Sequence, residues 1–212
     1  TIVSIITAGA VIIEEWHDIV PSILINWYNG CENGRALADV LAGRSSPSGH
    51  LPWSMPRAEV HLPSFDPDAN QVTYDKWFGQ RMLDKMGVEA AYPLGFGLSY
   101  TTFEVECIDF DTSSLDETLS LQVGARIYGC PDLGPGQHDF PNRLLAGFQV
   151  VELSGQETKW VQVKTSLAPF RRWEEGDLRL TARSILFQVG QYAGDQKSLS
   201  HRFHLRGAEA RL

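Results

Sequence analysis

The stretch TIVSIITAGAVIIEEWHDIVPSILINWYNGCENGRALADVLAG, residues 1–43, decides the fold class of the first half of the chain. Residues 1–7 are a short β-branched run, and residues 21–28 are a second one behind a polar crossing segment. Residues 32–41 then carry apolar side chains at helical spacing, and Gly43 follows as a helix-ending glycine. Strand, crossing segment, strand and helix in this order predict an α/β domain.

The next sixty residues contain fewer regular elements. Residues 45–68 carry five prolines spaced four to seven residues apart, which excludes a long helix or a central strand. We therefore expect a loop-rich connector there. Residues 74–86 have the apolar spacing of an amphipathic helix that Gly87 would end.

Beyond residue 100 the apolar period changes to two. In LSLQVGARI, residues 119–127, every odd position is apolar and the even positions are polar or glycine, which predicts one half-buried strand. Similar stretches, separated by turn signals, occupy residues 103–110, 147–153, 159–165, 185–192 and 199–205. Short strands at this spacing predict an antiparallel β-sandwich. We therefore expect two domains, 1–102 and 103–212.

Composition narrows the function classes. The 212 residues include 18 basic and 26 acidic side chains, a formal net charge of −8, so nucleic acid and anionic membranes are disfavoured partners. No apolar run approaches the length of a membrane span, and no signal peptide is visible. The ordinary hydrophobic fraction of 43% excludes intrinsic disorder as the main state.

The spacing of cysteines and histidines gives no support to a metal site, and no cofactor is expected. Cys31, Cys107 and Cys130 lie far apart, so at most one disulfide is possible, and we expect three small buried apolar side chains. The histidines are scattered, which predicts solvated or core side chains rather than ligands: His17, His50, His61, His138, His201 and His204.

Motifs for other chemistry are also absent. The sequence contains no GxxxxGK[ST] loop, no complete dinucleotide fingerprint and no GxSxG elbow. Glycoside hydrolysis needs two carboxylates about 5–9.5 Å apart. The candidates in the first half are Glu32, Asp39, Asp66, Asp75 and Asp84. Spacing selects no pair among them, and each also has a structural interpretation, such as Glu32 meeting the dipole at the first turn of its helix.

Aromatic side chains are dense in the first hundred residues. They leave two interpretations open, because flat rings stack on sugar faces but also pack loops onto a core. The residues concerned are Trp16, Trp27, Tyr28, Trp53, Tyr74, Trp77, Phe78, Tyr92 and Phe96.

Three motifs resemble those of one enzyme family. WYNGCENGRALADVLAG at residues 27–43, followed by PSGHLP at 47–52, is similar to a run found in glycoside hydrolase family 3, and so is YPLGFGLSYTTF at 92–103. LLAGF, VVEL and GQE within residues 144–157 resemble the fibronectin type III-like domain that ends many family 3 β-glucosidases. The resemblance covers nearly the whole chain, in the family's order.

The resemblance implies a layout of three parts: a barrel, an α/β sandwich and a fibronectin type III-like (immunoglobulin-like) sandwich. This chain looks like the C-terminal part of the α/β sandwich, residues 1–102, followed by the all-β module, residues 103–212. In the family the nucleophilic Asp lies in the barrel and the acid/base Glu lies upstream of this chain's first strand. The resemblance therefore assigns no catalytic residue here and leaves substrate-binding residues unknown.

The resemblance also implies a function and a location. We expect part of a secreted, retaining β-glucosidase-like enzyme whose β-glucoside or oligosaccharide substrate binds through the barrel domain. The alternative is a non-catalytic carbohydrate-associated or scaffold fragment. Because both catalytic carboxylates are expected outside this chain, we expect no hydrolysis by this chain alone.

Departures from the family pattern carry further expectations. Cys31 replaces a Gln, and Arg44-Ser45-Ser46 replaces an Asp-x-Asn sequence. The module's GxEVVQLY strand is absent between residues 127 and 143, which predicts an exposed sheet edge. The family pattern makes residues 74–84 extended rather than helical. An open sheet edge in residues 1–43 predicts aggregation or dimerisation.

Overall fold

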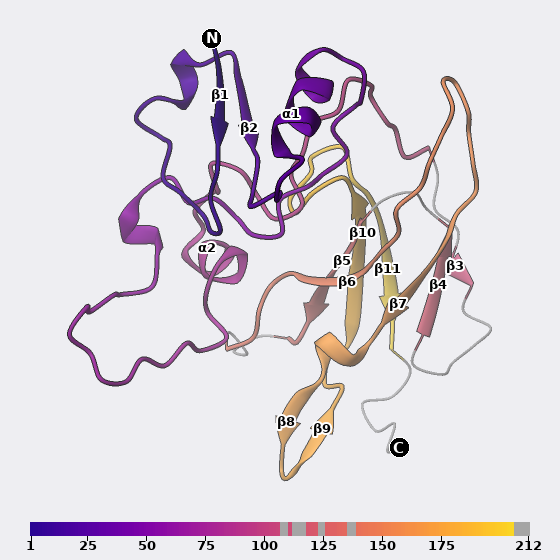
Figure 1. Ribbon diagram of the computed structural model, residues 1–212. Coiled ribbons are helices and arrows are strands. Elements are labelled where there is room, and N and C mark those ends of the chain that lie inside the picture. The colour runs from indigo at the N-terminus through magenta and orange to yellow at the C-terminus, as the bar shows by residue number, and fades with distance from the viewer. Residues whose placement is uncertain (107–109, 112–117, 123–125, 135–138, 206–212) are drawn as a thin grey trace. The chain divides into compact units, whose positions relative to one another are not determined.

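The computed structural model describes residues 1–106, 110–111, 118–122, 126–134 and 139–205 (Figure 1). The chain divides into two compact units, Thr1–Phe103 and Glu104–Leu212. Each unit is described by itself below. Neither described helix is long and apolar enough to cross a membrane.

Unit 1 opens with the two predicted strands and the predicted helix. β1 (Ile2–Ile5) pairs in parallel with β2 (Ser22–Ile25), and the short 3₁₀ helix η1 (His17–Ile19) lies in the crossing between them (Figure 1). The helix α1 (Asn33–Leu41) follows. It ends where Gly43 takes a φ of 70°, a left-handed value that suits glycine after a helix.

The remaining part of unit 1 is mostly irregular, as the prolines predict. It contains the 3₁₀ helix η2 (Glu59–His61) and the helix α2 (Gln80–Met86), which Gly87 ends with a φ of 66°. The helix predicted over residues 74–86 is therefore wrong for its first six residues, and the extended segment implied by the resemblance is wrong for the last five. The carboxylate of Asp75 accepts a hydrogen bond from the Trp77 N–H at 2.7 Å, and this local turn competes with a helix start.

Unit 2 is built from strands. In chain order its elements are β3 (Phe110–Asp111), β4 (Thr118–Gln122), β5 (Arg126–Asp132), β6 (Leu144–Phe148), β7 (Gln162–Ser166), the 3₁₀ helix η3 (Ala168–Phe170), β8 (Arg172–Glu174), β9 (Asp177–Arg179), β10 (Ser184–Gly190) and β11 (Leu199–His204). One antiparallel sheet has the order β11-β10-β5-β6, another has the order β3-β4-β7, and β8 pairs with β9 in a separate hairpin (Figure 1).

The structure corrects the strand predicted over residues 119–127. β4 ends at Gln122 and pairs with β7, whereas β5 begins at Arg126 and pairs with β10 and β6. The single strand predicted from the alternation is therefore two strands that belong to different sheets. The alternation of apolar residues in the sequence thus crosses the boundary between two strands of different sheets.

The strand expected to be absent is present. β5 (Arg126–Asp132) occupies the gap and lies inside the four-stranded sheet between β10 and β6. The predicted exposed edge at this place is therefore wrong. The strand is not predicted from its sequence, RIYGCPD, because it contains Gly129 and Pro131, and glycine and proline are uncommon inside strands.

Other strand predictions hold in part. β7, β10 and β11 lie mostly inside the predicted ranges 159–165, 185–192 and 199–205. The prediction for 147–153 is wrong beyond Phe148, where β6 ends, and the prediction for 103–110 lies partly outside the described residues.

Unit 2 has the larger buried core. Side chains from both of its main sheets share one cluster, which contains Ile127, Leu144, Ala146, Val163, Phe170, Ala182, Ile185, Phe187 and Val189. Phe170 and Phe187 meet edge to face with ring centroids 6.1 Å apart. In unit 1 the cluster of buried residues consists of Ile13, Leu51 and Met55 with partly buried neighbours.

Candidate functional site

The five carboxylates singled out by sequence hold different local positions. The Asp39 carboxylate lies 2.7 Å from Arg44 Nε, and the Asp84 carboxylate accepts a hydrogen bond from Gln80 Nε2 at 2.9 Å. Asp66 and Asp75 accept hydrogen bonds from backbone N–H groups two residues ahead. Glu32 precedes α1 at the N-cap position, and its side chain makes no capping hydrogen bond. Each of the other four has a structural role in its own turn or helix.

The cysteines and histidines do not gather. Within the described residues no group of three or more His, Cys, Asp or Glu side chains could hold a metal ion. Cys31 is exposed, so the expectation of a buried apolar side chain is wrong there, because the loop before α1 faces solvent. Cys130 is half-buried, and Cys107 and His138 lie outside the described residues.

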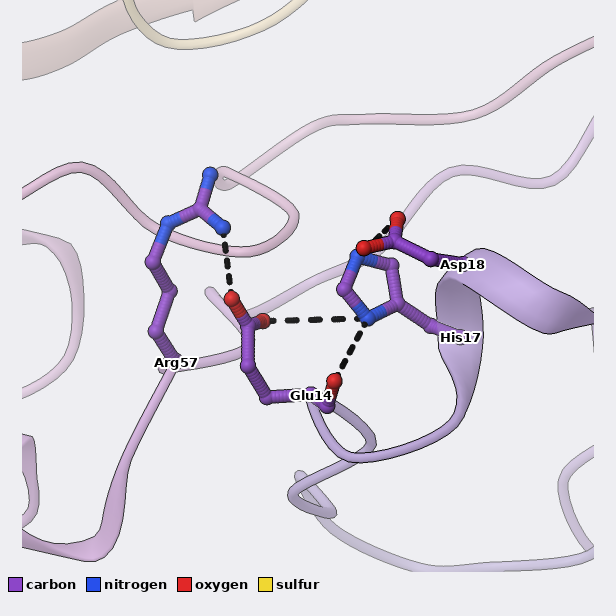
Figure 2. Close-up of polar contacts among 4 residues, drawn as sticks. All are labelled: Glu14, His17, Asp18 and Arg57. Carbon is purple, nitrogen blue, oxygen red and sulfur yellow. Dashed lines mark hydrogen bonds and ion pairs between the residues drawn. The ribbon is translucent and has the colours of Figure 1, made fainter.

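A polar cluster that sequence reasoning did not select joins the crossing segment to the proline-rich connector (Figure 2). Arg57 Nη1 donates to Glu14 Oε1 at 2.8 Å. His17 lies between two carboxylates, with Nδ1 3.8 Å from Glu14 Oε2 and Nε2 3.1 Å from Asp18 Oδ1. His17 Nδ1 also lies 3.2 Å from the Glu14 carbonyl oxygen, so both ring nitrogens face oxygen acceptors.

The cluster has one unsatisfied atom and one affected neighbour. Glu14 Oε2 is buried and accepts no hydrogen bond within the described residues. The His17 ring meets the Tyr92 ring edge-on, with centroids 6.3 Å apart. Burial raises the pKa of the Tyr92 hydroxyl above its ordinary value, and the Asp18 and Glu14 carboxylates raise it further. The cluster thus concentrates negative charge around one imidazole and one guanidinium.

Unit 1 also contains an apolar cavity of about 650 Å³. Ile23, Ile25, Leu37 and Val40 of β2 and α1 line it, together with residues of the segments 47–51 and 92–100. Its volume suits a small ligand. None of the described residues that line it is Asp, Glu, Lys or Arg, so the cavity supplies no carboxylate for acid–base or nucleophilic chemistry.

The aromatic residues divide between the two interpretations. Five pack against the buried residues of unit 1, namely Trp16, Trp27, Trp53, Tyr92 and Phe96. Trp27 and Trp53 meet edge to face with centroids 4.4 Å apart. Tyr28, Tyr74 and Phe78 are exposed, and Trp77 lies under the ammonium group of Lys85 at 4.2 Å. Core packing accounts for the first group only.

Sequence reasoning missed the cluster for a definable reason. Glu14, His17 and Asp18 lie within five residues of a segment that reads as a polar crossing, which is a visible signal. Arg57 is 43 residues away in a loop, and only folding brings its guanidinium to Glu14.

Residues 1–100, which hold the cavity, the cluster, the first motif and most of the second, match the family model described as "Glycosyl hydrolase family 3 C-terminal domain". These residues belong to glycosyl hydrolase family 3. The family assignment fits the parallel β1–β2 pair and the helix that follows it.

Relatives of this family extend the similarity over most of the chain. Probable beta-glucosidase K of Emericella nidulans is 33% identical over 91% of this chain and 24% of its own length. An exo-alpha-(1->6)-L-arabinopyranosidase of Bifidobacterium longum is 29% identical over 92% of this chain and 28% of its own length. The chain therefore spans about a quarter of these curated relatives.

A solved structure is similar in fold as well. Beta-glucosidase 3B from Thermotoga neapolitana, in complex with alpha-D-glucose, matches with a TM-score of 0.81 and 31% identity. The match covers 96% of this chain and 31% of that one. The described residues form mostly strands and two α-helices, and this fold is similar to that of the matched third of beta-glucosidase 3B.

Proposed function

We propose that this chain is the C-terminal part of a β-glucosidase-like family 3 glycoside hydrolase and carries none of its catalytic carboxylates. One observation carries the proposal: residues 1–100 match the family's C-terminal domain, while the part of probable beta-glucosidase K that matches this chain is 24% of that relative. The apolar cavity supports it, because no carboxylate lines that cavity within the described residues.

The proposed layout has two parts. Residues 1–102 form the end of an α/β sandwich with its proline-rich connector, and residues 103–212 form a fibronectin type III-like sandwich. Two antiparallel sheets that share one buried cluster support the second assignment. The proposed role of this second part is to brace the other domains of the enzyme.

The proposed reaction is a double displacement at the anomeric carbon of a terminal β-D-glucosyl residue. One carboxylate outside this chain attacks the sugar and a second protonates the leaving oxygen, as in retaining glycosidases. The substrate binds through the barrel domain, and the enzyme acts outside the cell. The sequence similarity to a relative named for arabinopyranosidase activity supports the proposal that residues outside this chain select the sugar.

A chimaera tests the proposal directly. The matching segment of Thermotoga neapolitana beta-glucosidase 3B is replaced by this chain, and hydrolysis of an aryl β-glucoside is measured. We expect turnover by the chimaera and none by the 212-residue chain alone. The matched control is the same enzyme truncated before the replaced segment, which we expect to be inactive.

Two outcomes would contradict the proposal. Turnover by the chain alone that Glu14→Gln abolishes would place the catalytic machinery inside it. A folded but inactive chimaera would favour the alternative, a non-catalytic carbohydrate-associated or scaffold protein.

We also propose that the isolated chain associates with itself through residues 1–43. β1 pairs only with β2 among the described strands, and the apolar side chains of Ile2, Ile6 and Ile19 are 53%, 59% and 80% exposed. Size-exclusion chromatography with light scattering should show dimers or larger species. Ile19→Lys should shift the population toward monomer, and a wild-type monomer peak would refute the idea.

A further inference from the structure

The β8–β9 hairpin of unit 2 presents an unusual surface. β8 and β9 pair antiparallel and extend as a short arm from the sheets of their unit (Figure 1). The turn between them consists of Glu175 and Gly176, with φ values of 51° and 85°. Two consecutive positive φ values are the signature of the type I′ turn, which matches the twist of paired strands and fixes their register.

That register places two apolar side chains together on the outer face. Trp173 pairs with Leu178, and their exposed fractions are 70% and 53%. Because side chains alternate along a strand, the residues on either side of Trp173 point to the opposite face.

The opposite face anchors the hairpin. The guanidinium of Arg172 lies 5.7 Å from the centroid of the Phe140 ring, and Arg172 Nε lies 3.6 Å from Glu174 Oε1. Phe140 itself packs against the core cluster of unit 2, and so does Leu180, which follows β9. The exposure of Trp173 therefore belongs to an ordered hairpin rather than to a loose loop.

The size of the surface decides what can bind it. A tryptophan offers roughly 150–250 Å² and a leucine less, whereas a stable protein interface needs about 800 Å² from each partner. The surface is large enough for the apolar face of one or two sugar rings. Arg179 pairs with Arg172, so its side chain lies on the face opposite Trp173. The ion pair of Arg179 Nη1 with Glu175 Oε2, 2.7 Å apart, therefore leaves the surface itself without a charged group from β9.

We propose that Trp173 and Leu178 form a stacking platform for a pyranose ring of an oligosaccharide or polysaccharide chain. This binding site is separate from the hydrolytic centre and makes no covalent change to the sugar. The proposal rests on the proposed function in one respect, namely that the ligand is a carbohydrate. Its geometric basis is an exposed, flat indole ring beside an exposed leucine on an ordered hairpin.

Native gel electrophoresis of the 212-residue chain tests this proposal. Mobility is measured with and without a soluble mixed-linkage β-glucan in the gel, and the ratio of the two removes any effect of self-association. We expect the glucan to retard the wild type. Trp173→Ala should raise the apparent dissociation constant at least about tenfold, because it removes the ring that stacks.

The chain provides a matched control in Trp160, which is 61% exposed in the same unit. Trp160→Ala should leave the retardation unchanged, and Trp173→Phe should restore most of it. Near-identical circular dichroism spectra would show that each variant is folded. No retardation of the wild type, equal retardation of Trp173→Ala, or equal loss in Trp160→Ala would overturn the proposal.

The results of this test and of the chimaera test distinguish a failure of the platform from a failure of the proposed function. Retardation needs no turnover, so a Trp173-dependent shift beside an inactive chimaera would reject only the enzyme assignment. An active chimaera beside a Trp173→Ala chain that binds like the wild type would reject only the platform.

Discussion

The two units differ in how many residues of their helices and strands are buried. In unit 2, β10 alone contains five buried residues out of seven, and the buried Phe187 of this strand meets the buried Phe170 edge to face. In unit 1, β1, β2 and α1 contain no buried residue. Its buried cluster of Ile13, Leu51 and Met55 comes from irregular segments, and α2 adds the buried Leu83. Two strands and one helix cannot cover each other's apolar faces, whereas two sheets can. We infer that unit 2 is the independently stable part.

The largest expected effect tests that inference in the core of unit 2. Phe187→Ala removes a fully buried ring that contacts Phe170, so it should lower the free energy of unfolding by about 3–5 kcal/mol. Chemical denaturation followed by circular dichroism measures it. Phe148→Ala, at a ring that is 63% exposed in the same unit, should change stability by no more than about 0.5 kcal/mol. Equal effects of the two substitutions would contradict a packed core in unit 2, on which the contrast between the units rests.

The second-largest expected effect is a loss of folding stability at alkaline pH. Burial raises the pKa of Tyr128 to about 12 from an ordinary value of 10, and nearby Arg126 and Arg143 only partly offset this. Because the folded state holds the proton more tightly, stability is fully present below pH 10 and is lost as pH rises toward 12, by up to about 3 kcal/mol.

Absorbance titration at alkaline pH combined with denaturation at several pH values measures this loss. Tyr128→Phe should flatten the decline between pH 10 and 12, since phenylalanine cannot ionise. An unchanged slope in that variant would show that another group causes the decline.

The third effect concerns a close approach inside the sheet. A methyl group on Gly129 would overlap the ring of Phe170, so Gly129→Ala should destabilise unit 2 by about 1–3 kcal/mol. Gly155→Ala is the control, because nothing lies within 4 Å of a Cβ placed there. Thermal unfolding compares the two, and a Gly129→Ala protein as stable as the control would mean that Phe170 can move aside.

The smallest effect lies in unit 1. The Arg57–Glu14 pair has partly exposed side chains, so removing it should cost about 0.2–1 kcal/mol and less at high salt. A double-mutant cycle with Arg57→Ala and Glu14→Gln measures the coupling between the two side chains. A coupling well above this range would indicate that the cluster around His17 contributes more to unit 1 than its exposure suggests.

Local patterns predicted the elements whose neighbours are close in the chain. The β-branched runs gave β1 and β2, helical spacing with Gly43 gave α1, and alternation gave the parts of β7, β10 and β11. They failed where a local interaction competes, as at Asp75, where a side-chain hydrogen bond to Trp77 delays the helix until Gln80. They also failed for β5, because Gly129 and Pro131 are uncommon in strands although β5 lies inside its sheet.

The sequence by itself determined the family motifs, the change of period near residue 100 and the absence of metal or nucleotide signatures. Only the tertiary structure brought Arg57 to Glu14, divided residues 118–132 between two sheets and turned Trp173 outward beside Leu178. The physical reason is range. Propensity, turn chemistry and apolar period act over a few residues, whereas strand pairing and ion pairs join positions far apart, and their partners become neighbours only when the chain has folded.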